Sequence, residues 1–241
     1  MSKDTCKRLM FMGVAFITAA VLAFAVLSVS GINTDGIKRA LRFTARFSFL
    51  LFWMAYSGGS LAVLISNHCD RVKHNLFCGV PLNDCSRWIA RHGRDFGLAF
   101  ASAHSVHLLL IICLYRLSPE PPLSTQGIVF FSIGMLWTYL LAVLSIQYMA
   151  QLVGSQWRSF RLVGMEYIML AFQSDFLPGS LGNDTKSLVG YLPFAVLGAA
   201  GTALRIFNRT RKTQPSTGGY FLLKRLFRYI RLGLKTSTPV E

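Results

Sequence analysis

A chain of 241 residues in which 53% are hydrophobic and only 15% are charged is not an ordinary soluble domain, because globular chains carry about 25% charged residues. The mean hydropathy is +0.46, and the apolar residues form long runs, so lipid is the expected solvent for most of the chain. The excess of 25 Lys and Arg over 10 Asp and Glu then indicates membrane orientation and binding to anionic membrane lipid, and no nucleic acid is expected as a partner.

The first apolar run, residues 9–32, is long enough to cross a hydrocarbon layer of about 30 Å. It exceeds the apolar region of a cleaved signal peptide, so we expect a retained helix. Five further spans are predicted, at residues 45–65, 97–117, 128–149, 162–177 and 188–207. The sequence therefore predicts an all-α integral membrane protein, with a six-helix transmembrane bundle over residues 1–207.

Two breaks in the pattern bear on the last spans. The fifth is the shortest and most polar, and we expect it to begin near Ser159 and to stop at Pro178-Gly179. Pro193 lies inside the sixth, which membrane helices tolerate where neighbours satisfy the freed carbonyl.

Six spans put both termini on one side of the membrane. Placing them in the cytoplasm puts most of the 25 Lys and Arg residues there, as the positive-inside rule favours. It leaves a basic cluster in the first outer loop, made of Lys38, Arg39, Arg42 and Arg46. We expect N- and C-termini in the cytoplasm and a bacterial inner membrane as the location.

The last segment, residues 208–241, is predicted as a basic cytoplasmic tail. Within it, residues 220–234 read YFLLKRLFRYIRLGL, an alternation of large apolar and basic side chains. Such a segment is too short and too charged to span, and is typical of an amphipathic helix lying on an anionic membrane surface. A disordered tail is the alternative.

The longest internal connection, residues 66–95, contains Cys69, Cys78 and Cys85, with His68 and His74 beside them. These are zinc-type ligands, but structural zinc sites use closely spaced cysteine pairs, and the spacing here is wider. On the cytoplasmic side the three cysteines would be free thiols; in the opposite orientation two of them could form a disulfide.

His104 and His107 lie three residues apart in the span 97–117 and therefore share a helix face. An imidazole in a dry bundle can coordinate haem iron, relay protons or hydrogen-bond a neighbouring helix. Small residues at 101–103 would let a flat ligand or another helix approach. These alternatives stay open at this point.

The span 162–177 contains Glu166 and Gln173, which are seven residues apart and share a face. An unpaired carboxylate in the membrane is costly, so Glu166 is expected to be protonated or paired. The candidate partners are Arg161, Arg158 and the histidines of the third span. The pair is read either as an interhelical hydrogen-bonding group or as part of a proton path or cofactor contact.

Three stretches resemble the ferric reductase-like transmembrane domain superfamily. They are residues 45–64, ARFSFLLFWMAYSGGSLAVL; the pattern Arg94-x-x-Gly97-Leu98 ending at His107; and residues 157–162, WRSFRL. The superfamily includes ferric reductases, NADPH oxidases and the haem-binding membrane subunit of bacterial methionine-sulfoxide repair. The resemblance covers roughly residues 40–205 and implies a six-span domain with a b-type haem, held through iron by His107, with His104 as the other cofactor-binding candidate.

The sequence departs from this family in one helix. The family's second haem-binding helix carries its own histidines, whereas the matching positions here are Phe160 and Gln173. All five histidines lie between residues 68 and 107, so a haem bridged by histidines of the third and fifth spans is excluded. The sixth iron ligand would be Met165, Met169, water or none.

The leading hypothesis is a membrane electron-transfer subunit that holds one haem b and exchanges electrons with a partner redox protein or subunit. No complete catalytic site is visible, and no length remains for a flavin or nicotinamide domain. The alternative is a cofactor-less membrane scaffold or accessory subunit derived from the same fold. A proton-coupled small carrier that uses Glu166 and the histidines is third.

Overall fold

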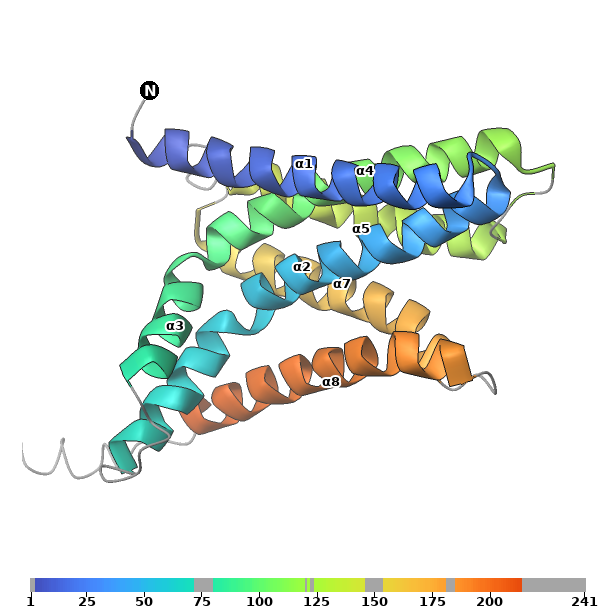
Figure 1. Cartoon of the computed structure of the whole chain (residues 1–241). Helices are drawn as coiled ribbons and strands as arrows, with labels where there is room; N and C mark the ends of the chain where they lie inside the picture. The colour runs from blue at the N-terminus through green and yellow to red at the C-terminus, as the bar shows by residue number, and fades with distance from the viewer. Residues whose placement is uncertain are drawn as a thin grey trace, which may run out of the picture. The chain divides into compact units, whose positions relative to one another are not determined.

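The computed structural model describes residues 3–71, 80–119, 121, 124–145, 154–180 and 185–213. Within these residues the chain is entirely helical and contains no strand, which confirms the predicted all-α class (Figure 1). The elements are α1 (Lys3–Ser30), α2 (Thr34–Arg71), α3 (Val80–Arg91), α4 (Gly93–Leu117), α5 (Thr125–Leu144), the 3-10 turn η1 (Gly154–Gln156), α7 (Trp157–Ser180) and α8 (Thr185–Thr213).

The chain divides into two compact units, Met1–Leu204 and Arg205–Glu241. The contacts and cavities described below belong to the first unit. The tail segment 220–234, predicted as an interfacial helix, lies outside the described residues. So do the side chains of Cys69 and Cys78, while Cys85 is an exposed free thiol.

Among the described residues, five helices are long and apolar enough to cross a membrane. These are Thr5–Ser30, Thr34–Ser66, Gly93–Leu117, Thr125–Leu144 and Val189–Thr210. Helix α7, which corresponds to the predicted fifth span, is not among them, because charged and polar side chains interrupt its apolar residues. Length and composition therefore identify five spanning helices where the sequence predicted six.

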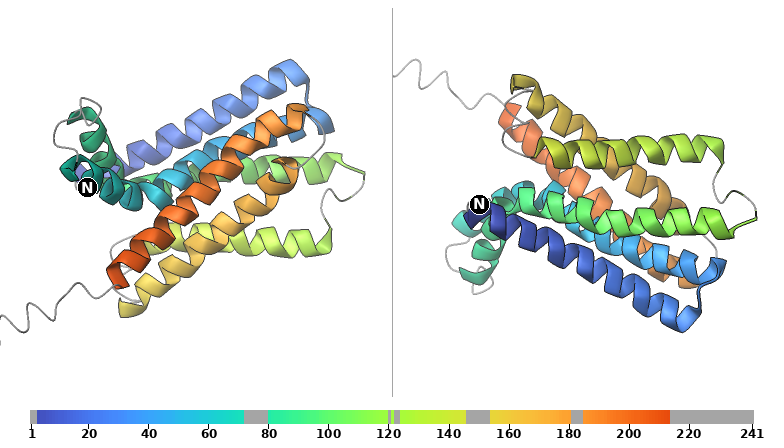
Figure 2. Two further views of the ribbon diagram at one scale, coloured as in Figure 1. Left: turned by 90° about the horizontal axis from the view of Figure 1, so that it is seen from below. Right: turned by 90° about the horizontal axis from the view of Figure 1, so that it is seen from above.

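A tight turn joins α1 to α2. Gly31 adopts a φ of +79°, which a glycine reaches without the strain that a Cβ would add. Its N–H donates to the carbonyl of Leu27 at 2.8 Å, and Asn33 Oδ1 accepts from the N–H of Gly36 at 2.7 Å. The turn closes one helix and caps the next, so α1 and α2 lie side by side as an antiparallel pair (Figure 2).

Helix α2 begins well before the predicted span 45–65, and the basic cluster expected in a loop is helical. The reason is a buried stripe of small and apolar side chains at helical spacing, formed by Ile37, Ala40, Thr44 and Ser48. This stripe continues into the apolar part of α2, which packs against α1 and α4.

The connection 66–95, for which the sequence indicated no span, contains a helix, α3. It packs against α2 and leads directly into α4. Helices α2 and α3 approach closely at Gly58 of α2, where an added Cβ would lie 2.7 Å from Cγ2 of Ile89 in α3. Trp88 of α3 also makes an edge contact with Phe96 of α4.

Aromatic side chains from four helices form the centre of the core. Phe49 and Phe52 of α2 are buried, and Phe172 of α7 makes ring contacts with both. Phe100 of α4 and Phe194 of α8 complete the cluster. Such ring pairs add about 0.5–1.5 kcal/mol each beyond area burial, so they hold α7 and α8 against α2 and α4.

Helix α5 packs on α7 through small residues. An added Cβ at Gly164 would lie 2.7 Å from Trp137 Cε3, and Tyr167 donates to the Phe130 carbonyl at 3.0 Å. Helix α7 runs through Pro178-Gly179 and ends at Ser180, slightly later than predicted. Pro193 lies within α8 as expected.

Candidate functional site

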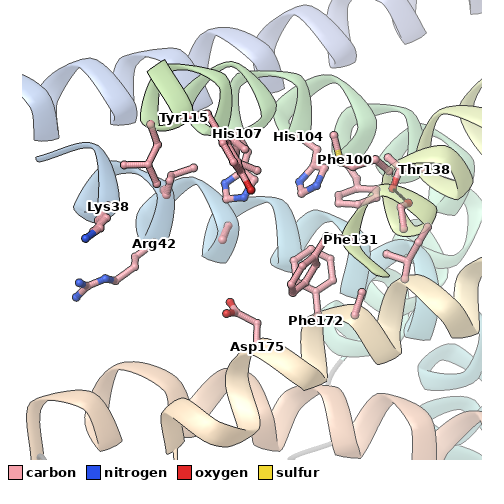
Figure 3. A pocket seen from close by; sticks show the side chains of 18 of the residues that line it. Lys38, Arg42, Phe100, His104, His107, Tyr115, Phe131, Thr138, Phe172 and Asp175 are labelled. Carbon is pink, nitrogen blue, oxygen red and sulfur yellow. Dashed lines mark hydrogen bonds between the residues drawn. The ribbon is translucent and has the colours of Figure 1, made fainter. Parts of the chain in front are cut away.

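A cavity of about 330 Å³ lies between α2, α4, α5, α7 and α8, and both histidines of α4 line it. Its volume falls within the range of small-molecule sites, roughly 300–1,000 Å³. Figure 3 shows His104 and His107 projecting from α4 toward the space that Asp175 of α7 faces from the other side. The prediction that the two histidines share one face is confirmed by their common position in this wall.

The ring of His107 is fixed by α2. Its Nδ1 lies 3.0 Å from the hydroxyl oxygen of Thr44. That hydroxyl also lies 3.0 Å from the Ala40 carbonyl and 3.1 Å from the Leu41 carbonyl. Carbonyls only accept, so when the hydroxyl proton goes to the backbone of α2, the Thr44 oxygen accepts from Nδ1–H of His107. The backbone contacts of Thr44 favour this tautomer, which leaves the lone pair on Nε2.

The ring of His104 lacks such a partner. It stacks on His107 with centroids 5.0 Å apart and an interplanar angle of 16°, and it lies 5.2 Å from the ring of Phe100. Its Nδ1 is buried and has no hydrogen-bond partner among the described residues. A buried ring nitrogen without a partner costs about 1–3 kcal/mol, which a polar or metal-containing ligand in the cavity would recover.

Aromatic side chains form the inner wall of the cavity. Phe100, Phe131, Phe172 and Tyr191 come from four different helices, and Phe172 makes an edge contact with His104 at 6.2 Å. Flat, apolar walls of this kind suit a planar hydrophobic ligand and exclude water around it.

Charged side chains line the other end. Lys38 and Arg42 of α2 lie on one side of the cavity and Asp175 of α7 on the other (Figure 3). Arg46, one turn further along α2, stacks over the rings of Tyr191 and Phe194. Lys38 and Arg42, two members of the basic cluster that was expected in the first outer loop, therefore line the histidine cavity.

The donor set of these residues is of the kind that binds haem. An imidazole is a haem-iron ligand, the aromatic side chains would contact a macrocycle, and Lys38 and Arg42 would pair with its two carboxylates. Met165 and Met169, the predicted thioether candidates, are buried but do not line this cavity, whereas Met135 of α5 does. Nothing local in the sequence distinguishes Met135, because its place depends on how α5 packs against α7.

Glu166 does not line the histidine cavity. Tyr56 of α2 donates to its Oε2 at 2.6 Å. The sequence did not predict Tyr56 as a partner of Glu166, because the contact joins residues that are 110 positions apart. This hydrogen bond satisfies part of a carboxyl group that the bilayer would otherwise penalise.

Gln173 also lies outside the cavity. Its Nε2 donates to the Ala195 carbonyl at 3.4 Å, and it packs so closely on α8 that a Cβ at Gly198 would overlap it. Its neighbour Phe172 lines the cavity instead. Phe160, the other position matched to a family histidine, contacts Trp137 of α5.

Arg161 lines a second cavity of about 450 Å³ together with Arg94. This cavity lies where α4 and α7 begin and α5 ends, with Gly93, Trp157 and Ser145 in its wall. Phe100 and Thr138 line both cavities and so form a shared wall. Sequence analysis identified Arg161 only as a partner for Glu166.

Among the described residues, no group of three or more His, Cys, Asp and Glu side chains is arranged to hold a metal ion. A single imidazole remains sufficient for haem, because the porphyrin supplies the other ligands. Comparisons with family models, with curated proteins and with solved structures found no match for this chain.

Proposed function

We propose that this chain is a membrane electron-transfer subunit that holds one haem b, whose iron His107 would bind. The observation that carries the proposal is the hydrogen bond from His107 Nδ1 to Thr44 beside the cavity. Metal-binding histidines almost always donate their other ring N–H to a protein acceptor. A bound haem would supply a one-electron couple between a partner and an acceptor.

The other residues of the cavity would bind the haem and orient its histidine ligand. Thr44 holds the imidazole of His107 in one tautomer, and Phe100 and Phe172 provide apolar surface that excludes water. Lys38 and Arg42, which line the cavity, would pair with the carboxylates of the haem through charge-assisted hydrogen bonds. His104 cannot clamp the same iron from the opposite side, because it stacks on His107 along one helix face.

Met135 is our candidate for a second side chain that would bind the iron. It lines the histidine cavity from α5, a different helix from the one that carries His107. Histidine–methionine ligation raises the reduction potential of a haem. Met135→Leu is therefore expected to lower the potential and change the reduced spectrum while haem stays bound; an unchanged spectrum assigns the sixth position to water or to no ligand.

The same proposal includes the number of membrane spans and the orientation of the chain. Helix α7 would be the sixth span of a bundle of the ferric reductase-like type in which one helix supplies the histidine ligand. The bonds of Glu166 and Gln173 to α2 and α8 support this, because they satisfy polar groups that lipid would not. Both termini would lie in the cytoplasm of a bacterial cell, with the chain in the inner membrane beside a redox partner.

The deciding experiment is a haem-to-protein ratio with a reduced-minus-oxidised spectrum on the full chain, expressed with ample haem supply. We expect about one b-type haem per chain, since the described part of the chain offers one such cavity with a fixed imidazole. His107→Ala should abolish the spectrum. His92→Ala is the matched control, because His92 lies at the start of α4 and bonds the Trp88 carbonyl at 2.9 Å.

A colourless wild-type preparation would contradict the proposal. The cofactor-less scaffold would then be favoured, and His107→Ala should lower stability in detergent without any spectral change. Loss of haem in both His107→Ala and His92→Ala would also count against His107 as the ligand, because it would reflect a general loss of folding.

A further inference from the structure

We propose that the second cavity binds the phosphate group of one anionic phospholipid, with Arg94 and Arg161 holding the phosphate and the apolar wall holding part of an acyl chain. This site is separate from the histidine cavity and does not depend on haem. It uses two arginines that the proposed function leaves without a role.

The first argument is charge. Arg94 of α4 and Arg161 of α7 line the cavity and interact electrostatically with each other, and Arg8 of α1 is close to Arg94 as well. The neighbouring carboxylate, Asp95, pairs with Arg8 at 3.4 Å. Nε of Arg94 is buried and has no hydrogen-bond partner among the described residues. Three guanidinium groups therefore lie near one carboxylate, which pairs with Arg8, and the Nε–H group of Arg94 lacks a partner among the described residues. This excess of positive charge favours binding of an anion.

The second argument is backbone polarity. Gly93 and Trp157 place the first turns of α4 and α7 in the wall of the cavity, and helix N-termini carry unpaired N–H groups and partial positive charge. Gly97 lies in the same wall with no side chain to fill the space. Guanidinium groups that can bind two oxygens at once match a phosphate better than a halide.

The third argument is the apolar remainder of the wall. Phe52, Phe100, Leu141, Ala142 and Met165 continue the cavity away from the arginines. Free phosphate would leave this surface uncovered, whereas the chain of a lipid would bury it. The ends of three membrane helices meet here, which is the depth of lipid headgroups. The chemistry of the whole cavity therefore fits an anionic amphiphile.

Native mass spectrometry of the full chain, released from nanodiscs of phosphatidylcholine with one-fifth phosphatidylglycerol, tests the site. We expect one retained phosphatidylglycerol per wild-type chain, weakened about tenfold by Arg94→Gln or Arg161→Gln and more by both. The matched control is the double variant Arg91→Gln/Arg158→Gln. Both residues are exposed, lie three positions before Arg94 and Arg161, and do not line the cavity.

A folding defect is separated from lost binding in two ways. Tm in a neutral detergent without anionic lipid should be the same for wild type and variants, and Arg94→Lys should retain part of the binding because it keeps the charge. Equal loss in the control variant would overturn the site, because it would reflect overall charge. Displacement of the lipid by inorganic phosphate at equal concentration would overturn the assignment to a lipid.

Discussion

Thr44 of α2 and His107 of α4 are joined by a 3.0 Å hydrogen bond although 63 positions separate them in the chain. Thr44 is fully buried, and its proton is directed to the backbone of its own helix. With the imidazole as donor to the hydroxyl, the bond sets which ring nitrogen of His107 can meet a ligand. The bond also joins α2 to α4, two of the helices that form the histidine cavity.

Thr44→Val should weaken haem retention about 10–100-fold, the range typical for loss of an orienting hydrogen bond to a metal-binding histidine. Titration of haem into apoprotein measures this affinity. Thr138→Val is the matched control, because Thr138 is buried, lines the same cavity and donates to the Gly134 carbonyl of its own helix. Equal weakening in both variants would contradict an orienting role for Thr44.

Asp175→Asn should strengthen haem retention by several-fold, because the carboxylate of Asp175 faces the cavity where the ligand's own carboxylates would bind. Lys38→Gln/Arg42→Gln should have the opposite effect. The same titration measures both changes. If Asp175→Asn instead abolished uptake driven by a pH gradient in proteoliposomes, the carrier hypothesis would gain support with Asp175 in place of Glu166.

Tyr56 and Glu166 should be energetically coupled through their 2.6 Å hydrogen bond. We expect Tyr56→Phe and Glu166→Gln each to destabilise the protein, and the double variant to lose less than the sum. A coupling energy of about 0.6 kcal/mol or more is typical for such bonds between membrane helices. Unfolding in mixed micelles gives the free energies, and strict additivity would show that the bond contributes nothing.

Gly164→Ala should destabilise the α5–α7 pair by about 1–3 kcal/mol, because its Cβ would lie 2.7 Å from Trp137 and 3.0 Å from Leu141. Gly59→Ala is the control, since nothing lies within 4 Å of its added Cβ. That change should be neutral or slightly stabilising through helix propensity. Unfolding free energies compare the two, and a neutral Gly164→Ala would mean that the two helices separate easily.

Hydropathy predicted most spanning helices because lipid contact requires apolar side chains along nearly the whole of a span. It failed at the start of α2, where Lys38, Arg39 and Arg42 suggested a loop. The helical signal there is the spacing of Ile37, Ala40 and Thr44 on the buried face, which an average over the window hides. It also missed α3, whose one apolar face packs against α2 in a segment that is polar overall.

Spacing alone placed His104 and His107 on one face, because helix geometry fixes that relation. The partners of the polar residues could not be predicted in the same way. Thr44 and Tyr56 reach His107 and Glu166 from another helix, and Gln173 turned toward α8 while its neighbour Phe172 lines the cavity. These contacts depend on how each helix is rotated against the next, which no local pattern records.

The closed turn at Gly31 and Asn33 has a consequence for biosynthesis. Because only a few residues separate α1 from α2, the two helices cannot insert independently. We expect them to enter the bilayer together as a helical hairpin. Whichever way α1 faces, α2 faces the other way.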